Sequence, residues 1–229
     1  MNAKQRKVAF FDLDGTLIKA HLWLGLVKHN LKFKKNVFET CWYIFSHMAL
    51  TPFWLIRLIS KERYYRTWGE DASRMIKGTE VAKVKDTLNW LSDKYLLPTI
   101  KKNIFERLKR HQKEGFLTIL TSGSFEDLLK IIASRLEINF TVGTKLETIK
   151  GKFTGKIIRP LCFGRGKVER IEYLVKEKNL SINFKESFAY SDGIFDLPLL
   201  KLVGHPVVVD PGKELLEIAG KKGWVILKA

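Results

Sequence analysis

Short apolar segments alternate with amphipathic helical patterns along most of this chain, and this alternation limits the folds that it can adopt. The apolar segments cover residues 8–11, 116–121, 188–191, 207–209 and 224–227. The helical patterns cover residues 100–113, 126–136, 167–178 and 213–221. Strands that alternate with helices of this length form a parallel sheet with helices on both faces. We therefore predict an α/β fold with a doubly wound parallel sheet.

The alternation stops between residues 19 and 98, where Trp, Phe, Leu and Ile recur at helical spacing and no comparable strand pattern is present. We predict that residues 19–98 form an inserted helical domain. Residues 1–18 and 99–229 would form the domain that contains the sheet. Residues 145–159 differ again, because short alternating runs surround their glycines. This last pattern predicts a β-hairpin.

The composition indicates a folded protein without a disulfide framework. Of the 229 residues, 45% are hydrophobic and 15 are Phe, which is enough apolar material for a core. Disordered chains, collagens and disulfide-stabilised miniproteins are thereby excluded. Cys41 and Cys162 lie far apart, so we expect two buried thiols in a reducing compartment. The basic start MNAKQRK is not followed by an apolar signal segment, so we expect the chain to begin near Met1.

Two pairs of acidic residues follow predicted strands. Asp12 and Asp14 follow the first strand, and Asp192 and Asp196 follow the third. The carboxyl ends of parallel strands gather at one edge of a sheet, where ligands bind. Carboxylates that meet there repel one another unless a cation offsets their charge. An acidic set without His or Cys suits Mg²⁺ better than zinc.

Two further segments carry groups that bind anions. Ser122 and Gly123 follow a predicted strand and precede a helix, so a hydroxyl and backbone N–H groups would face an anion at the helix N-terminus. Lys167 opens another predicted helix and supplies a positive charge. Gly15, after the first acidic pair, permits the chain to turn sharply. The sequence thus predicts one site that binds a phosphate together with Mg²⁺.

The order of these residues resembles the haloacid dehalogenase (HAD) superfamily, in its phosphoserine-phosphatase-like branch, subfamily IB. The run FDLDGT is similar to the first motif of this family, and the run SDGIFD is similar to its fourth. Ser122 matches the second motif and Lys167 the third. The resemblance implies a Rossmann-like core, a helical cap of the C1 type at residues 19–98, and an enzyme that hydrolyses phosphoric monoesters.

The resemblance also implies a role for each motif residue. Asp12 would be the nucleophile that forms an aspartyl-phosphate, and Asp14 would protonate the leaving alcohol and then activate water. Mg²⁺, the implied cofactor, would be bound by the Asp12 carboxylate, the Asp14 carbonyl and Asp192, while Asp196 would complete this set or orient the lysine. The phosphate would be bound by Gly15, Thr16, Ser122, Gly123 and Lys167. Thr16 would also support the position of Asp14.

The residues expected in the cap differ from those of phosphoserine phosphatases. In that family a Glu nine positions after the nucleophile contacts the substrate amine, whereas His21 stands at that position here. Ala72 occupies the position of the Arg that would contact the substrate carboxylate, with Arg74 two positions away as the alternative. We therefore expect a substrate other than phosphoserine. His21 either contacts that substrate or packs on the surface of the cap.

Residues 40–59 are apolar and rich in aromatic side chains, with Arg57 as their only charged residue. Basic residues flank them, and residues 28–66 contain 8 Lys and Arg against 2 Asp and Glu. Apolar surface flanked by cations binds anionic membrane interfaces, and the pattern resembles that of bacterial phosphatidylglycerophosphate phosphatases. Two interpretations follow: a buried pair of cap helices, which we prefer, or the membrane contact of a lipid-phosphate phosphatase. We expect a cytoplasmic protein, peripheral on the inner face of the membrane in the second case.

The chain carries 41 Lys and Arg against 24 Asp and Glu, a net charge of +17. Such an excess attracts nucleic acids, anionic membranes and phosphorylated substrates alike, and it predicts no oligomeric state. No nucleic-acid-binding motif accompanies the Lys residues, so no nucleic-acid partner is expected. The expected partner is a small-molecule or lipid phosphomonoester, whose phosphate is released to water or transferred to another acceptor.

Overall fold

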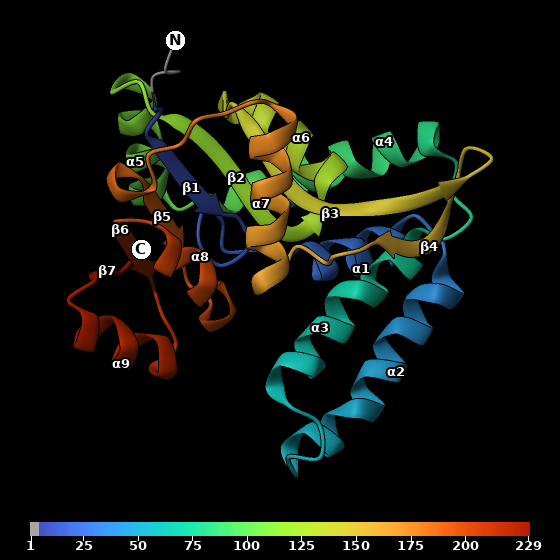
Figure 1. The fold of residues 1–229 in the computed structure, drawn as a ribbon. Coiled ribbons are helices and arrows are strands. Elements are labelled where there is room, and N and C mark those ends of the chain that lie inside the picture. The colour runs from blue at the N-terminus through green and yellow to red at the C-terminus, as the bar shows by residue number, and fades with distance from the viewer. Residues whose placement is uncertain (1–4) are drawn as a thin grey trace.

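The computed structural model describes residues 5–229 (Figure 1). The expected start at Met1 lies in residues 1–4, outside the described part of the chain. The described residues contain a 7-stranded sheet in the order β4-β3-β2-β1-β5-β6-β7. The strands are β1 (Val8–Asp12), β2 (Leu117–Phe125), β3 (Phe140–Ile149), β4 (Lys152–Ile158), β5 (Phe188–Ser191), β6 (His205–Val209) and β7 (Val225–Leu227). All neighbouring pairs except β3 and β4 are parallel, which confirms the predicted Rossmann-like, doubly wound fold.

Strand β1 lies at the centre of the sheet, between β2 and β5. Its five residues are all buried, because helices cover both faces of a central parallel strand. Asp12, its last residue, pairs with Thr121 of β2. Phe11 pairs with Tyr190 of β5, and their rings stack with centroids 4.5 Å apart. This register places the carboxyl ends of the three strands side by side.

Helices cover both faces of the sheet, and each face has its own hydrophobic cluster. The helices of this part are α5 (Lys102–Lys113), α6 (Glu126–Leu136), α7 (Arg165–Glu177), α8 (Leu197–Leu202) and α9 (Lys213–Lys222). One cluster joins α5 and α6 to strand residues such as Phe11 and Val209. The other joins α7, α8 and α9 to their strand neighbours Phe10 and Val208. Successive strand residues therefore face opposite layers of helices.

The segment between β1 and α5 is helical. Its elements are α1 (Leu22–Lys32), α2 (Val37–Leu55), α3 (Lys61–Asp71) and α4 (Val81–Trp90), with the short helices η1 (Ala72–Ile76), η2 (Leu91–Leu96) and η3 (Leu97–Thr99). The chain leaves and re-enters the sheet domain at adjacent points, because the Lys19 N–H donates to the Thr99 carbonyl at 3.1 Å and the Lys101 N–H donates to the Leu17 carbonyl at 2.9 Å. The helical character agrees with the expected insertion. The domain boundaries at residues 18/19 and 98/99 stay a prediction.

Strand β3 is longer than the predicted hairpin. It starts at Phe140, where it pairs with β2 in parallel, and it forms the expected antiparallel hairpin with β4 from Lys145 onward. The sequence pattern does not reveal the parallel half because Gly143 interrupts a short apolar run. Helix α8 is also not predicted, since its six residues are too few to show helical periodicity.

The two cysteines differ in burial. Cys162 is buried, and burial raises the pKa of its thiol to about 12. Cys41 lies on α2 and is exposed, so the expectation of two buried thiols is wrong for Cys41. Apolar residues occupy nearly every side of α2, so the sequence pattern does not predict which side of the helix faces the rest of the protein.

Helix α2 buries one side and exposes the other. The rings of Tyr43 and His47 pack on Trp68 of α3, with centroids 5.4 and 4.6 Å from it. The other side and the turn after α2 form an exposed apolar face made of Phe38, Trp42, Phe45, Met48, Phe53, Leu55, Ile56 and Leu58. The preferred expectation of a buried helix pair is therefore correct for one side of α2 only. Figure 1 shows α2 and α3 side by side, projecting away from the sheet.

Within residues 5–229, no helix is both long enough and apolar enough to cross a membrane.

Candidate active site

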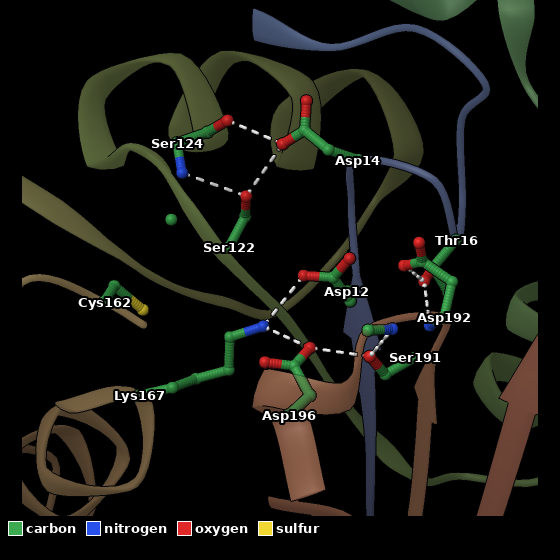
Figure 2. Close-up of polar contacts among 12 residues, drawn as sticks. Asp12, Asp14, Thr16, Ser122, Ser124, Cys162, Lys167, Ser191, Asp192 and Asp196 are labelled. Carbon is green, nitrogen blue, oxygen red and sulfur yellow. Dashed lines mark hydrogen bonds and ion pairs between the residues drawn. The ribbon is translucent and has the colours of Figure 1, made fainter. Parts of the chain in front are cut away.

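A cavity of about 660 Å³ lies where the carboxyl ends of β1, β2 and β5 meet the start of α7. It is lined by eight of the expected site residues, namely Asp12, Asp14, His21, Ser122, Gly123, Lys167, Asp192 and Asp196. Figure 2 shows that most of these side chains converge from separate strands and helices. Gly15 and Thr16 do not line the cavity, although both contact Asp192. The structure thus brings together the four motifs that the sequence separates.

The ammonium of Lys167 lies between two carboxylates. Its Nζ donates to Asp12 Oδ1 at 2.8 Å and to Asp196 Oδ2 at 2.6 Å, and the side chain is almost fully buried. Burial by itself would lower the pKa of Lys167, but the charges of Asp12 and Asp196 outweigh it and raise the pKa. Lys167 therefore remains charged at neutral pH.

For the carboxyl of Asp12, the effect of burial on the pKa outweighs that of the neighbouring ammonium. Burial raises the pKa of Asp12 well above its usual value, and the nearby Lys167 offsets only part of this effect. The charges of Asp196 and Asp192 raise the pKa of Asp12 further. One buried ammonium thus faces three carboxylates, and the site carries an excess of negative charge.

Asp196 is directed at the lysine. Its Oδ2 accepts from Lys167 Nζ at 2.6 Å and from Ser191 Oγ at 2.7 Å. Two alternatives were open for Asp196, a metal-binding role or the orientation of Lys167. These contacts support the second alternative, because the same oxygen is held by the last residue of β5 and fixes the position of the ammonium.

Asp192 is held by the turn that follows β1. Thr16 Oγ1 donates to Asp192 Oδ1 at 2.8 Å, and the Asp192 N–H donates to Thr16 Oγ1 at 2.9 Å. Gly15 has a φ of +84°, and a Cβ there would collide with the Asp192 carboxylate. The expectation that Thr16 supports Asp14 is therefore wrong, since its hydroxyl holds Asp192.

The carboxylate of Asp14 points toward β2 and away from Asp12 (Figure 2). Its Oδ2 accepts from Ser122 Oγ at 2.9 Å and from Ser124 Oγ at 2.7 Å. Its Oδ1 accepts from the N–H of Leu22, the first residue of α1, at 2.8 Å. Asp14 thus joins the sheet domain to the helical insertion.

Ser124 is a site residue that the sequence reasoning did not identify. The available signal was its spacing, because residues two apart on a strand point to the same side, and Ser122 was already a candidate. Both serines lie in β2, which continues as a strand to Phe125. The apolar pattern in the sequence ends the strand at Thr121, so it does not predict the alternation of side chains beyond that residue.

The oxygen atoms of this site fit a hard divalent cation. Asp12 and Asp192 supply carboxylates, burial raises the pKa of both, and a cation would offset the excess negative charge around them. Asp14 and Asp196 direct their carboxylates at the serines and at Lys167 instead. Within residues 5–229, no group of three or more His, Cys, Asp or Glu side chains is arranged to hold a metal. An ion here would therefore also need backbone and water oxygens, and the Asp14 carbonyl is the expected backbone ligand.

The insertion supplies one wall of the cavity. His21 and Ala72 both line it. Arg74 does not, because it lines a different cavity and its Nε donates to Asp71 Oδ1 at 3.0 Å. Ala72, which stands at the position expected to carry an Arg in phosphoserine phosphatases, thus lines the cavity. Arg74 does not replace that Arg, because its side chain lies elsewhere.

Sequence comparison places the chain among hydrolases. The pattern of the haloacid dehalogenase-like hydrolase family matches residues 9–201. The chain is 28% identical to a probable phosphatase of Mycobacterium tuberculosis, over 98% of this chain and 76% of that protein. It is also 28% identical to a histidinol-phosphatase of Neisseria meningitidis, over 97% of this chain and 98% of that protein.

Solved structures share the fold. A protein of unknown function from Bordetella pertussis superposes with a TM-score of 0.83 at 22% identity, covering 98% of this chain and 99% of that one. A substrate-bound phosphoserine phosphatase superposes with a TM-score of 0.65 at 19% identity, covering 98% of this chain and 94% of that one. Both carry the same arrangement of sheet and helices.

The buried lysine gives a prediction for stability. We predict that Lys167→Met lowers the free energy of unfolding by about 3–5 kcal/mol at about pH 8, because it leaves two buried carboxylates without their cation. Without Lys167 the pKa of Asp12 rises further, and a carboxylate with a raised pKa in the folded state destabilises that state as pH increases through the pKa. The loss should therefore be smaller at about pH 5. Denaturation in EDTA at both pH values measures it.

Lys130→Met is the matched control. Lys130 pairs with Asp127 at 3.2 Å on the surface, and such pairs contribute less than about 1 kcal/mol. This variant should lose little stability at either pH. A loss in Lys167→Met that equals the control, or that grows as pH falls, would contradict the charge arrangement described above.

Proposed function

Because the chain belongs to the haloacid dehalogenase-like hydrolases, we propose that it hydrolyses a phosphate monoester through a phosphorylated Asp12, with Mg²⁺ as cofactor. Family membership and the relatives named phosphatases confirm the expected phosphoric monoester hydrolase of the phosphoserine-phosphatase-like branch. The observation that carries the mechanism is the position of Asp12, at the end of the central strand and in contact with Lys167 at 2.8 Å.

Asp12 acts as the nucleophile in this proposal. Lys167 holds its Oδ1, so the other oxygen is presented to phosphorus. Attack forms the bond between this oxygen and phosphorus and breaks the bond between phosphorus and the leaving alcohol. Lys167 and the Gly123 N–H bind the phosphoryl oxygens, together with Ser122, whose hydroxyl turns from Asp14 to the substrate when the substrate binds. These groups stabilise the charge on the phosphoryl oxygens during the transfer. Mg²⁺, bound by Asp12, Asp192 and the Asp14 carbonyl, would offset further charge on those oxygens.

Asp14 moves the protons. Its carboxyl gives a proton to the leaving oxygen and then accepts one from a water molecule. The oxygen of this water attacks phosphorus, and the bond between phosphorus and the Asp12 oxygen breaks, which releases phosphate and restores the Asp12 carboxylate. The hydroxyls of Ser122 and Ser124 and the N–H of Leu22 orient this carboxyl. Thr16 orients Asp192 in the same way through its hydroxyl. The carboxyls of Asp14 and Asp192 therefore each have a polar neighbour that limits their rotation.

Phosphoserine remains an unsuitable substrate. The cavity wall presents Ala72 where a cation would bind the substrate carboxylate, and His21 where an anion would bind the amine. The relatives are named for different substrates, among them histidinol phosphate. The insertion, which supplies this wall, would therefore determine which alcohol is accepted.

Turnover of p-nitrophenyl phosphate tests the nucleophile and the metal. We predict that Asp12→Asn lowers kcat by at least about three orders of magnitude, because loss of a nucleophile leaves only binding and electrostatic effects. EDTA should abolish wild-type turnover and Mg²⁺ should restore it. Asp86→Asn, an exposed change on α4, is the matched control and should leave kcat unchanged. Turnover that survives in Asp12→Asn, or that does not require metal, would rule out this mechanism.

A lipid-phosphate phosphatase at an anionic membrane surface is a second candidate function. The exposed apolar face of α2 favours it, because contiguous apolar surface of this kind is uncommon on proteins that stay in water. Arg57 lies between Ile56 and Leu58 in sequence, and Lys61 and Arg63 follow a few residues later. Apolar side chains enter the interface while neighbouring cations bind anionic headgroups. The protein would then be peripheral on the inner face of the membrane.

Flotation with phosphatidylglycerol liposomes tests this candidate. We predict that the wild type floats and that Ile56→Glu/Leu58→Glu does not, because two carboxylates in the apolar face oppose insertion. Ile149→Glu/Ile158→Glu changes two exposed residues of the β3–β4 hairpin and should float as the wild type does. If the wild type stays unbound and releases no phosphate from phosphatidylglycerophosphate, this candidate is eliminated.

A further inference from the structure

The wall that the insertion contributes to the active-site cavity is aromatic. Six of its residues form what we name the aromatic wall: Trp23, Tyr43, Trp54, Tyr64, Tyr65 and Trp68. They come from α1, α2 and α3 and face a cavity of about 660 Å³ whose floor holds Asp12 and Lys167. The catalytic residues and the wall therefore enclose one space.

The rings of the aromatic wall pack against one another. Trp54 stacks on Tyr64, with centroids 4.9 Å apart and an interplanar angle of 11°. Trp68 contacts Trp23 edge to face at 5.2 Å. Tyr65 packs on Phe195 of the sheet domain at 5.6 Å. The wall thus extends from the insertion to the segment that carries Asp196.

The polar atoms of two wall residues are used within the insertion. The hydroxyl of Tyr43 donates to the Trp68 carbonyl at 3.2 Å. The hydroxyl of Tyr64 shares a hydrogen bond with Thr51 Oγ1 at 2.9 Å. Because these hydroxyls already have hydrogen-bond partners, Tyr43 and Tyr64 would contact a bound molecule through their rings.

Charged side chains around the cavity come from the sheet domain only. In the part of the chain that the structure describes, the lining residues from the insertion include no Asp, Glu, Lys or Arg. Lys61 and Arg66 lie over the rings of Phe195 and Phe163 but do not line the cavity. They pair instead with Glu214 at 3.3 Å and with Glu62 at 2.6 Å. A charged group on the leaving alcohol would find no Asp, Glu, Lys or Arg side chain of opposite charge on this wall.

We propose that the aromatic wall selects phosphomonoesters whose alcohol carries an uncharged apolar group, either a ring or a hydrocarbon chain. This inference rests on the proposed phosphatase function and specifies the substrate class of the same site. The phosphate binds at Lys167 and Ser122, and the apolar group leaves water to pack on Trp54 and its neighbours. Burying a ring or a chain of this size in an aromatic cavity contributes enough binding to discriminate strongly against a short alcohol.

Matched alkyl phosphates test the proposal, because their alcohols are similar leaving groups. The set is ethyl phosphate, 2-phenylethyl phosphate and n-octyl phosphate as uncharged members, with phosphoserine, histidinol phosphate and choline phosphate as charged members. We expect kcat/KM for the phenylethyl or octyl ester to exceed that for the ethyl ester by about 10–100-fold, and the charged members to be no better than the ethyl ester. The phenylethyl and octyl results distinguish a ring-bearing substrate from a lipid-like one.

Variants connect this preference to the wall. Trp54→Ala should reduce the preference over the ethyl ester at least about tenfold, since it removes the ring that stacks on Tyr64. Trp42→Ala is the matched control: Trp42 also lies on α2 but lines a different cavity, and this variant should keep the full preference. Calorimetric binding of 2-phenylethylphosphonate and ethylphosphonate provides a readout that does not depend on turnover and should show the same difference.

Different outcomes overturn different claims. If Asp12→Asn abolishes turnover of the ethyl ester but the phenylethyl and octyl esters show no preference, the inference is wrong and the proposed function stands. A preference for phosphoserine would also overturn the inference. A preference for choline phosphate would replace the apolar wall with a cation-binding aromatic cage. If no ester is hydrolysed and the two phosphonates bind equally, both proposals fail.

Discussion

The active site depends on one buried cation, the ammonium of Lys167, which lies among carboxylates from separate parts of the chain. It contacts Asp12 at 2.8 Å and Asp196 at 2.6 Å. A buried charge without a partner is costly, so these contacts favour one arrangement of β1, α7 and the segment after β5. The same contacts leave the site with more negative than positive charge, which suits a divalent cation. Burial is the main cause that raises the pKa of Asp12 and of Asp192, and the charge of the neighbouring Asp196 raises both further.

The insertion is tied to this site through polar groups near the first motif. The Leu22 N–H donates to Asp14 at 2.8 Å. Lys101, where the chain re-enters the sheet domain, is buried and donates to the Gly15 carbonyl and to Asp210. A displacement of α1 from the sheet domain would therefore break a hydrogen bond to the acid that the mechanism requires. The insertion, which supplies the cavity wall, is thus connected by a hydrogen bond to Asp14, the residue that transfers protons in the proposed mechanism.

The sequence predicts the sheet, its main helices and the convergence of the motif residues, because the end of a parallel strand determines where its last side chain lies. Which side chains form hydrogen bonds with one another within the site is harder to predict from the sequence. Thr16 holds Asp192 instead of Asp14, since the turn at Gly15 rotates its hydroxyl toward β5. Ser124 becomes visible only when β2 is known to continue beyond Thr121. The side of α2 that is buried depends on its packing against α3, which a uniformly apolar helix does not encode in its pattern.

The central claim is that Asp12 becomes covalently phosphorylated and that Asp14 is needed to release the phosphate. Rapid acid quenching of Asp14→Asn during turnover of p-nitrophenyl phosphate, followed by peptide mass spectrometry, tests it most directly. The account predicts a phosphate that is labile to base, is located on Asp12, and accumulates to a higher level in Asp14→Asn than in the wild type. A phosphate on another residue, or none on the quenched protein while p-nitrophenol is released, would contradict it.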